Sequence, residues 1–152
     1  MPMFIKQADL FSGVSSHFLK AMMELATKKS YDAGQTLFNR GDPANHFYIL
    51  VTGSIELTTT SNEKEFYTGN QTGESFGWSS LIERDIYTAS ARCREPTVVL
   101  KLDKNALLQI IDDDPASGII FYKYLAKTLC RRLLKSYEIL ADCNDGKSHR
   151  TV

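Results

Sequence analysis

The sequence predicts a mainly β domain, an antiparallel sandwich or barrel with helices at both ends. In residues 30–102, short β-branched and aromatic runs alternate with turn segments such as "DAG" and "TGS". Many short strands joined by glycine-containing turns have few other compact arrangements. Apolar residues recur at helical spacing both before and after this region. The predicted order is therefore helix, β-barrel, helices.

The first helix is predicted over about residues 15–28. Ser15 or Ser16 can cap its N-terminus, because a serine hydroxyl accepts a hydrogen bond from a free amide of the first turn. The apolar residues that recur every three to four positions are Phe18, Leu19, Met22, Met23 and Ala26. We interpret this face as core packing.

The β region, about residues 30–102, contains a predicted hairpin around Gly53. The residues that alternate with period two on either side of this turn are Phe47, Ile49, Val51, Ile55 and Leu57. Because successive side chains of a strand point to opposite faces, this alternation predicts a hairpin with one buried face. The segments "NEKEFYTGNQTG", "YTASARC" and "TVVLKL" continue the strand pattern.

Two helices are predicted over about residues 104–141, followed by a polar tail at 142–152. Asp103 is a suitable N-cap for the first of them, and Pro115 separates it from a longer helix that reaches about Ala141. At heptad spacing the long helix presents a mostly apolar stripe: Ile119, Tyr122, Ala126, Leu129, Leu133, Ser136 and Leu140. Such a stripe fits either packing on the barrel or a two-helix seam between subunits.

Composition argues against several classes of function. The 152 residues suit one domain, and 18 basic against 18 acidic side chains argue against non-specific binding to a polyanion. No signal-peptide pattern and no stretch of about 18 apolar residues occurs, so we expect a cytoplasmic protein without a membrane partner. The three cysteines and three histidines match no metal-ligand or catalytic spacing. We therefore predict a non-enzyme without a metal, a resident cofactor or catalytic residues.

Two segments resemble the cyclic-nucleotide-binding domain family, the regulatory domain of catabolite activator-type regulators and of cyclic-nucleotide-dependent kinases and channels. "YDAGQTLFNRGDPANHFYILVTGSIEL" is similar to a glycine-containing run of the family, and "GESFGWSSL" is similar to its phosphate-binding cassette. The similarity extends from about Leu10 to Leu134. It implies an antiparallel β-roll, or jelly roll, with an N-terminal helix and a long C-terminal helix.

The cassette has features that suit an anion. Gly73 and Gly77 let the backbone run close to a ligand without a Cβ atom in the way. Residues 77–82 can form a short helix whose first amides lack internal acceptors and whose dipole favours negative charge. The predicted ligand-binding residues are Phe76, Gly77, Trp78, Ser79, Ser80, Arg84, Tyr87, Thr88, Ala89 and, from the resemblance, Ser136.

Two cassette residues depart from the family pattern. The resemblance implies a glutamate for the ribose where this chain has Trp78, and an arginine for the cyclic phosphate where it has Tyr87. Losing the charged hydrogen bond costs about 1.5–3 kcal/mol and losing the other contact about 1 kcal/mol more, which weakens ordinary cyclic AMP binding roughly a hundredfold. Three explanations stay open: Arg84 supplies the missing charge, the aromatic rings bind another ligand, or the rings fill the old cavity.

The predicted function is a stand-alone regulatory domain that binds a nucleotide or other small ligand and signals through its C-terminal helix by a population shift. The alternative is a ligand-free dimerisation or protein-interaction module. The apolar stripe predicts a homodimer through that helix. Only the 11 residues 142–152 follow Ala141, too few for a helix-turn-helix, so no direct DNA binding by this chain is expected. We interpret Glu74 as a solvated turn carboxylate and the basic run 131–135 as a charged outer face.

Overall fold

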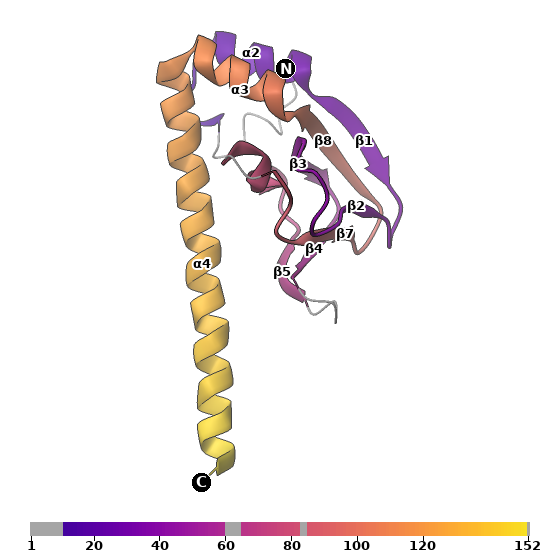
Figure 1. Ribbon diagram of the computed structural model, residues 1–152, viewed down its shortest axis with the longest axis vertical. Coiled ribbons are helices and arrows are strands. Elements are labelled where there is room, and N and C mark those ends of the chain that lie inside the picture. Colours follow the sequence, from indigo (N-terminus) through magenta and orange to yellow (C-terminus); the bar gives the residue numbers. More distant parts are fainter. Residues whose placement is uncertain (1–10, 60–64, 83–84, 152) are drawn as a thin grey trace.

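The computed structural model describes residues 11–59, 65–82 and 85–151 of the chain. In chain order its elements are α2 (Ser16–Leu25), β1 (Thr27–Tyr31), β2 (Thr36–Phe38), β3 (His46–Thr52), β4 (Ile55–Thr58), β5 (Glu65–Gly69), β6 (Ser75–Phe76), η2 (Trp78–Leu81), β7 (Ser90–Cys93), β8 (Thr97–Asp103), α3 (Lys104–Asp113) and α4 (Pro115–Thr151). Within these residues the strands form two 4-stranded antiparallel sheets, ordered β1-β8-β3-β6 and β2-β7-β4-β5. The predicted antiparallel β-roll is confirmed, with α2 and α3 at one end and α4 along its side (Figure 1).

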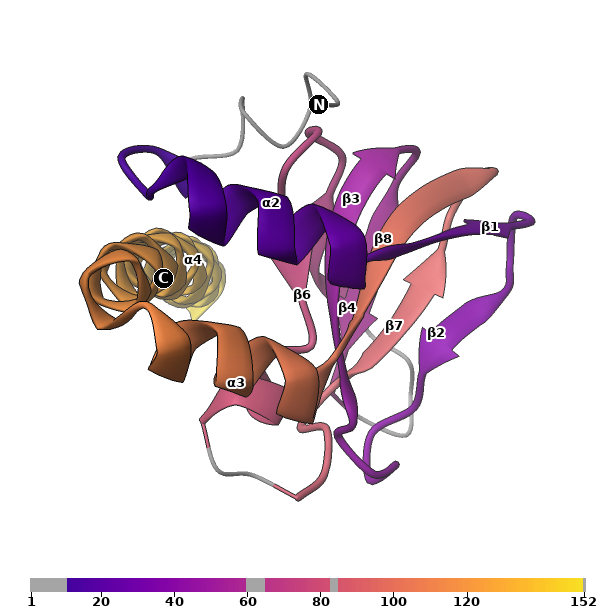
Figure 2. The same cartoon turned by 90° about the horizontal axis from the view of Figure 1, so that it is seen from above.

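Strand β3 lies at the centre of the fold. It pairs with both β8 and β6, and its central residues are all buried. Phe47, Ile49 and Val51 pack in a core shared with the helices, whereas Tyr48 and Leu50 face the interior of the roll. The predicted alternation is present within β3, but the prediction of a hairpin around Gly53 with a single buried face is wrong. Strands β3 and β4 belong to different sheets, so the turn at Gly53 carries the chain from one sheet to the other. Helices cover one side of the first sheet and the second sheet covers the other (Figure 2).

The first helix is shorter than predicted. Ser15 is its N-cap, as expected, and accepts the Phe18 amide at 3.0 Å. However, α2 ends at Leu25, and β1 begins at Thr27 instead of continuing the helix to about residue 28. Strand β1 pairs with β8 along its whole length, starting with Thr27 opposite Lys101. This ladder overrides the local helical spacing, because strand formation depends strongly on tertiary context.

Helix caps join the start of α4 to the start of α2. Asp114 accepts the Ser15 hydroxyl at 2.7 Å and the Ser117 amide at 3.2 Å. The Ser117 hydroxyl accepts the Ser15 amide at 2.9 Å. The hydrogen bonds from Ser15 and Ser117 hold the pKa of the Asp114 carboxyl below its ordinary value. Asp103 caps α3 as predicted, by accepting the Ala106 amide at 3.0 Å.

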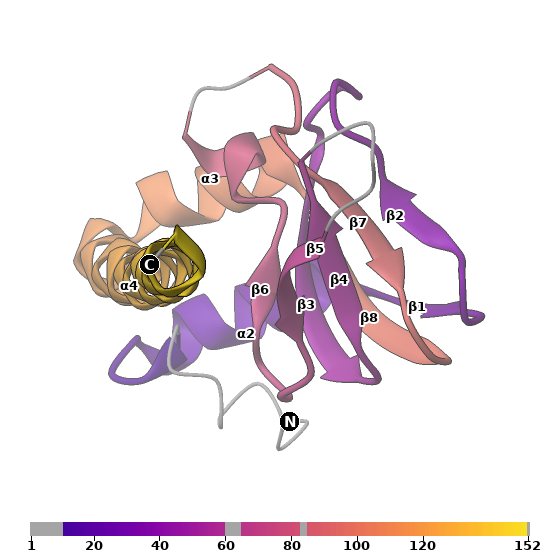
Figure 3. The same cartoon turned by 90° about the horizontal axis from the view of Figure 1, so that it is seen from below.

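Helix α4 is longer than predicted. It runs to Thr151, so residues 142–151 of the predicted polar tail have a helical backbone. No proline follows Ala141 to end the helix sterically. Phe121 and Leu125 in its first part are buried against the rest of the molecule, whereas its last part extends beyond the roll (Figure 1). From below, α4 lies beside β6 (Figure 3). None of the helices in the described part of the chain is long and apolar enough to span a membrane.

Candidate functional site

The cassette leaves β6 through a tight turn at Gly77. This residue has a φ of +81°, and a Cβ atom there would lie 2.8 Å from the His46 carbonyl oxygen. The chain then enters η2, a single 3₁₀ turn, in which Ser80 donates its amide and its hydroxyl to the Gly77 carbonyl at 3.1 and 2.7 Å. The short helix predicted within residues 77–82 is confirmed. The Ser80 amide, however, already serves the turn itself and is not open to an anion.

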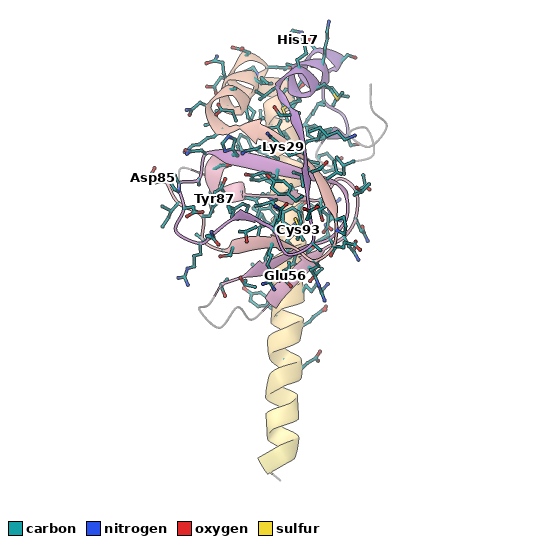
Figure 4. All side chains as sticks on the ribbon, turned by 90° about the vertical axis from the view of Figure 1, so that its right-hand side faces the viewer. His17, Lys29, Glu56, Asp85, Tyr87 and Cys93 are labelled. Atoms are coloured by element: carbon teal, nitrogen blue, oxygen red, sulfur yellow. The ribbon has the colours of Figure 1, made fainter. Side chains whose placement is uncertain are left out.

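Tyr87 fills the interior of the roll. Its side chain is 3% exposed, and its ring stacks on Phe38 with the two centroids 3.9 Å apart. Its hydroxyl donates to the His46 carbonyl at 2.7 Å and accepts the His46 amide at 3.1 Å. Burial raises the pKa of Tyr87, and Figure 4 shows this residue within the roll. The hydroxyl that could have contacted a phosphate is therefore engaged inside the protein.

Trp78 lies on the side of the cassette that faces α4. Its indole Nε1 donates to the Ser75 hydroxyl at 2.8 Å, which fixes the orientation of the half-buried ring. The guanidinium of Arg132 from α4 lies over this ring, with its Cζ 4.0 Å from the ring centroid. The two departures from the family pattern thus have different surroundings: Tyr87 is in the core, and Trp78 is between the roll and the helix.

Arg132 reaches from α4 into an aromatic cage, a name used below for Tyr67, Phe76 and Trp78. Its Cζ lies 4.5, 5.0 and 4.0 Å from these three ring centroids. Its Nη2 donates to the Ser75 carbonyl at 2.8 Å. The side chain is only 10% exposed. Burial lowers the pKa of the guanidinium, although arginine stays protonated in proteins. One cation of the helix therefore occupies the space beside the cassette.

Glu74 places a negative charge next to the aromatic cage. Its carboxylate accepts the Tyr67 hydroxyl and, at 2.9 Å, the Gln71 amide. Its Oε1 lies 4.0 Å from Arg132 Nη2. Burial and the bond to Glu74 raise the pKa of Tyr67. The expectation of a solvated turn carboxylate is wrong, because β5 and α4 bring partners to Glu74 that are distant in the sequence.

The other predicted ligand-binding residues lie in varied surroundings. Those buried in β6 and η2 are Phe76, Ser79 and Ser80. Thr88 is exposed and Ala89 is partly buried, just before β7. Arg84 lies outside the described residues, as do the side chains of Ser136 and Leu140. A role of Arg84 as the missing cation therefore stays a prediction.

The interpretation of residues 131–135 as an outer face is wrong for one residue. Arg131 is exposed, but Arg132 points towards the roll. Positions 121, 125 and 132 share one side of a helix, because their spacings of 4 and 7 are close to whole turns. The buried Phe121 and Leu125 therefore put Arg132 on the inward side. The exposed members of the heptad stripe, such as Ile119, lie on a different side of the same helix, so the stripe does not predict the inward position of Arg132.

A hollow of about 680 Å³ lies elsewhere, between residues 12–13 and α4. Its described lining includes Ile120 and Tyr124 with two lysines, Lys123 and Lys127. No described cassette residue lines it. Among the residues that the structure describes, no group of three or more His, Cys, Asp or Glu side chains could hold a metal ion. The space beside the cassette is the candidate site, because groups from four elements, β5, β6, η2 and α4, meet there.

Comparisons with protein families and curated proteins agree with this architecture. The family model described as "Cyclic nucleotide-binding domain" matches residues 28–114. A CRP-like cAMP-activated global transcriptional regulator of Mycobacterium tuberculosis is 24% identical over 144 residues, which cover 93% of this chain and 62% of the regulator. This chain therefore spans less than two thirds of the length of that relative.

Two solved structures share the fold of this chain. A protein from Geobacter metallireducens, described as cyclic nucleotide-binding, is 26% identical with a TM-score of 0.77, and the match covers 87% of this chain and 97% of that one. The catabolite activator protein of Thermus thermophilus is 25% identical with a TM-score of 0.71 over 88% of this chain and 63% of that one.

Proposed function

Because this chain belongs to the cyclic nucleotide-binding domain family, we propose that it is a regulatory domain that binds a small ligand between the cassette and α4 and signals through that helix. One observation supports this most directly: the Arg132 guanidinium of α4 occupies the space beside the cassette. A ligand that enters this space has to displace Arg132. It thereby favours a different packing of α4, and the size of the shift equals its difference in affinity for the two packings.

The ordinary mode of cyclic AMP binding is not part of this proposal. Tyr87 stands where the family resemblance implies a phosphate-binding arginine, and its hydroxyl donates to the His46 carbonyl instead. Trp78 stands at the glutamate position and carries Arg132 over its ring. A nucleotide or other small ligand of this chain therefore needs contacts that differ from those of relatives with both charged residues.

A panel of ligands tests the proposal, with one measurement at the cassette and one on α4. Trp78 is the only tryptophan of the chain, so its fluorescence reports on the site, and amide hydrogen exchange along residues 121–135 reports on the packing of α4. The panel contains cyclic AMP, cyclic GMP, the 5′-monophosphates and small organic cations. A ligand at 100 times its Kd raises the free energy of unfolding by about 2.7 kcal/mol. We expect that ligand to change the Trp78 signal and to lower amide protection around Arg132.

The variant Arg131→Ala is the matched control, because Arg131 is the exposed neighbour of Arg132. It should respond to the same ligand as the wild type does. A ligand that binds without altering exchange in α4 would contradict signalling through that helix. If no member of the panel binds the folded protein, the alternative of a ligand-free module gains support.

We also propose that α4 joins two copies of the chain. Three members of the predicted stripe, Ile119, Ala126 and Leu133, are exposed, the first by 69% and the last by 51%. Tyr122 and Leu129 of the same stripe pack against the core, whereas these three do not cover the roll, which supports a subunit seam along their side of the helix. Tyr137, which is 56% exposed, lies on the same side of the helix. The same stripe supports the alternative function, a dimerisation module without a ligand.

Light scattering at tens of micromolar tests the seam. The wild type should be a dimer and Leu133→Glu a monomer, because a carboxylate at the seam cannot be buried without a partner. Ile86→Glu is the control, since Ile86 is a similarly exposed apolar residue on the roll, at 47%. Cys130 is exposed beside the stripe. In a Cys143→Ser background, a short bismaleimide should therefore link two chains that keep Cys130 but not two chains that also carry Cys130→Ser. A wild-type monomer would contradict the proposal.

A further inference from the structure

We propose that the aromatic cage, with Glu74, is a binding site for small organic cations, above all those with a guanidinium group, and that Arg132 is its internal occupant. This inference rests on the proposed function, because it assigns a chemical class to the ligand of the same site. It departs from the family expectation of an anionic ligand.

The groups of the roll that contact Arg132 attract positive charge, and a second cation of α4, Lys135, lies 5.4 Å from the Tyr67 ring centroid. Three ring faces lie within 5.0 Å of the Arg132 Cζ, and the face of an aromatic ring carries the negative part of its quadrupole. Glu74 adds a carboxylate at 4.0 Å, and the Ser75 carbonyl accepts a hydrogen bond at 2.8 Å. Several aromatic faces around a cation are the arrangement by which proteins recognise organic ammonium groups. The site thus selects for charge as well as for a flat shape.

The cage is held in place by contacts that do not involve Arg132. The indole of Trp78 donates to the Ser75 hydroxyl at 2.8 Å. Glu74 is held by the Tyr67 hydroxyl and by the Gln71 amide. Because these bonds come from the roll itself, the cage should keep its shape when α4 moves away, which favours binding through preorganisation.

Gly69 of β5 lies beside two groups of this site, Phe76 and Glu74. A Cβ atom at Gly69 would lie 2.4 Å from Phe76 Cζ and 2.9 Å from Glu74 Oε2. The absence of a side chain at this position therefore allows the Phe76 ring and the Glu74 carboxylate to lie close to the backbone of β5. Both of them face Arg132.

A phosphate is poorly matched to the emptied cage. Once Arg132 has left, the anion would meet the Glu74 carboxylate and three ring faces, all of which repel negative charge. The Tyr87 hydroxyl, the nearest replacement for the family's arginine in the cassette, donates to the His46 carbonyl. An anion bound to Arg132 itself is the competing outcome, and the experiment below includes it.

Arg132 competes with any external cation. A ligand whose binding-competent state is only partly populated binds with an affinity reduced by that population. Removing the internal occupant should therefore increase cation affinity, by at least about tenfold if the cage is filled by Arg132 for 90% of the time or more. An anion that uses Arg132 would show the opposite change, a loss of affinity.

The experiment titrates wild type, Arg132→Ala and Arg131→Ala with methylguanidinium, tetramethylammonium, methylammonium and cyclic AMP, using Trp78 fluorescence. We expect saturable binding of methylguanidinium that is at least about tenfold tighter to Arg132→Ala than to the other two proteins. Methylammonium should bind more weakly, because it is small and strongly hydrated. Thermal unfolding of Arg132→Ala, with and without Trp78→Leu, is the second measurement. Methylguanidinium should stabilise only the protein that keeps Trp78.

The outcomes distinguish a failure of the cation assignment from a failure of the proposed sensor function. Binding of cyclic AMP but not of cations, with loss of affinity in Arg132→Ala, would overturn the cation assignment and leave the sensor function standing. Cation binding to Arg132→Ala without any effect on α4 exchange in the wild type would support the cage but contradict signalling. If folded Arg132→Ala binds neither class of compound, both proposals are wrong.

Discussion

Helix α4 contacts the rest of the molecule in two regions that differ in kind. Near its start it is held by apolar packing and caps: Phe121 is fully buried, and Asp114 joins α4 to Ser15 of the α2 cap. About three turns beyond Phe121, a buried cation, Arg132, joins it to the cassette. Apolar packing has no simple competitor in solution, whereas a cation in an aromatic cage can be replaced by another cation. The comparison suggests a helix with a permanent attachment at one end and an exchangeable one in the middle.

The largest expected effect comes from breaking the permanent attachment. Phe121 is 0% exposed, and its ring contacts Phe11, Phe18 and Phe47 with centroids 5.9 to 6.2 Å apart. We expect Phe121→Ala to lower the free energy of unfolding by about 3–5 kcal/mol, since it removes a buried ring and leaves a cavity. Urea denaturation measures this. Ile86→Ala, at a 47% exposed position of the roll, is the control and should change stability by about 0.5 kcal/mol or less. Similar losses in both variants would contradict the proposed attachment.

The next largest expected loss of stability comes from the place where α3 packs closely against α4. A Cβ atom at Gly118 would lie 2.7 Å from Ile111 Cγ2. Gly118→Ala should therefore cost about 1–3 kcal/mol by overpacking, although alanine favours a helix by about 1 kcal/mol. In an Ile111→Ala background the cost should fall by roughly half or more, because the clashing methyl group is gone. Four proteins in a double-mutant cycle test this, and an unchanged cost would show that the carbonyl of Ile111 sets the limit instead.

The exchangeable attachment should contribute less to stability. We expect Arg132→Ala to lower the free energy of unfolding by about 1–2 kcal/mol, the range for a desolvated cation over aromatic rings. Amide exchange should speed up around residue 132 but not around Phe121. Arg131→Ala, at the exposed neighbouring position, keeps the aromatic cage occupied and should change both measurements less than Arg132→Ala does. A loss as large as that of Phe121→Ala would mean that the two attachments do not differ as proposed.

The smallest effect concerns the cap at Asp114 and depends on pH. Hydrogen bonds from Ser15 and Ser117 lower the pKa of its carboxyl in the folded protein. A lowered folded pKa means that the stabilisation is fully present above the unfolded pKa, near 3.9, and is lost as the pH falls through the folded value. The unfolding free energies of wild type and Asp114→Asn should therefore differ at pH 7, begin to converge near pH 4, and meet only below the lowered pKa of the folded protein. Asp112→Asn, at an exposed position, should follow the wild type. A constant difference across this range would exclude titration of Asp114 as its origin.

Features set by short stretches of sequence could be predicted. The glycine turns and β-branched runs predicted the roll, and single polar residues at helix starts predicted the caps at Ser15 and Asp103. The two buried faces of β3 could not be predicted from alternation, because they depend on which layers cover the sheet. The roles of Glu74 and Arg132 depend on which side of α4 meets the cassette. That is a relation between elements far apart in the chain, and the stripe of exposed apolar residues on α4 pointed to the other side.

The stack of Tyr87 on Phe38 has a consequence for substitutions at position 87. Tyr87 is both a cassette residue and a part of the core, so replacing it with arginine would remove its two hydrogen bonds to His46 and bury a charge against an aromatic ring. We therefore expect Tyr87→Arg alone to lower the free energy of unfolding, whatever ligand the cassette binds. The Phe38 stack thus limits which residues position 87 can accept while Phe38 is present.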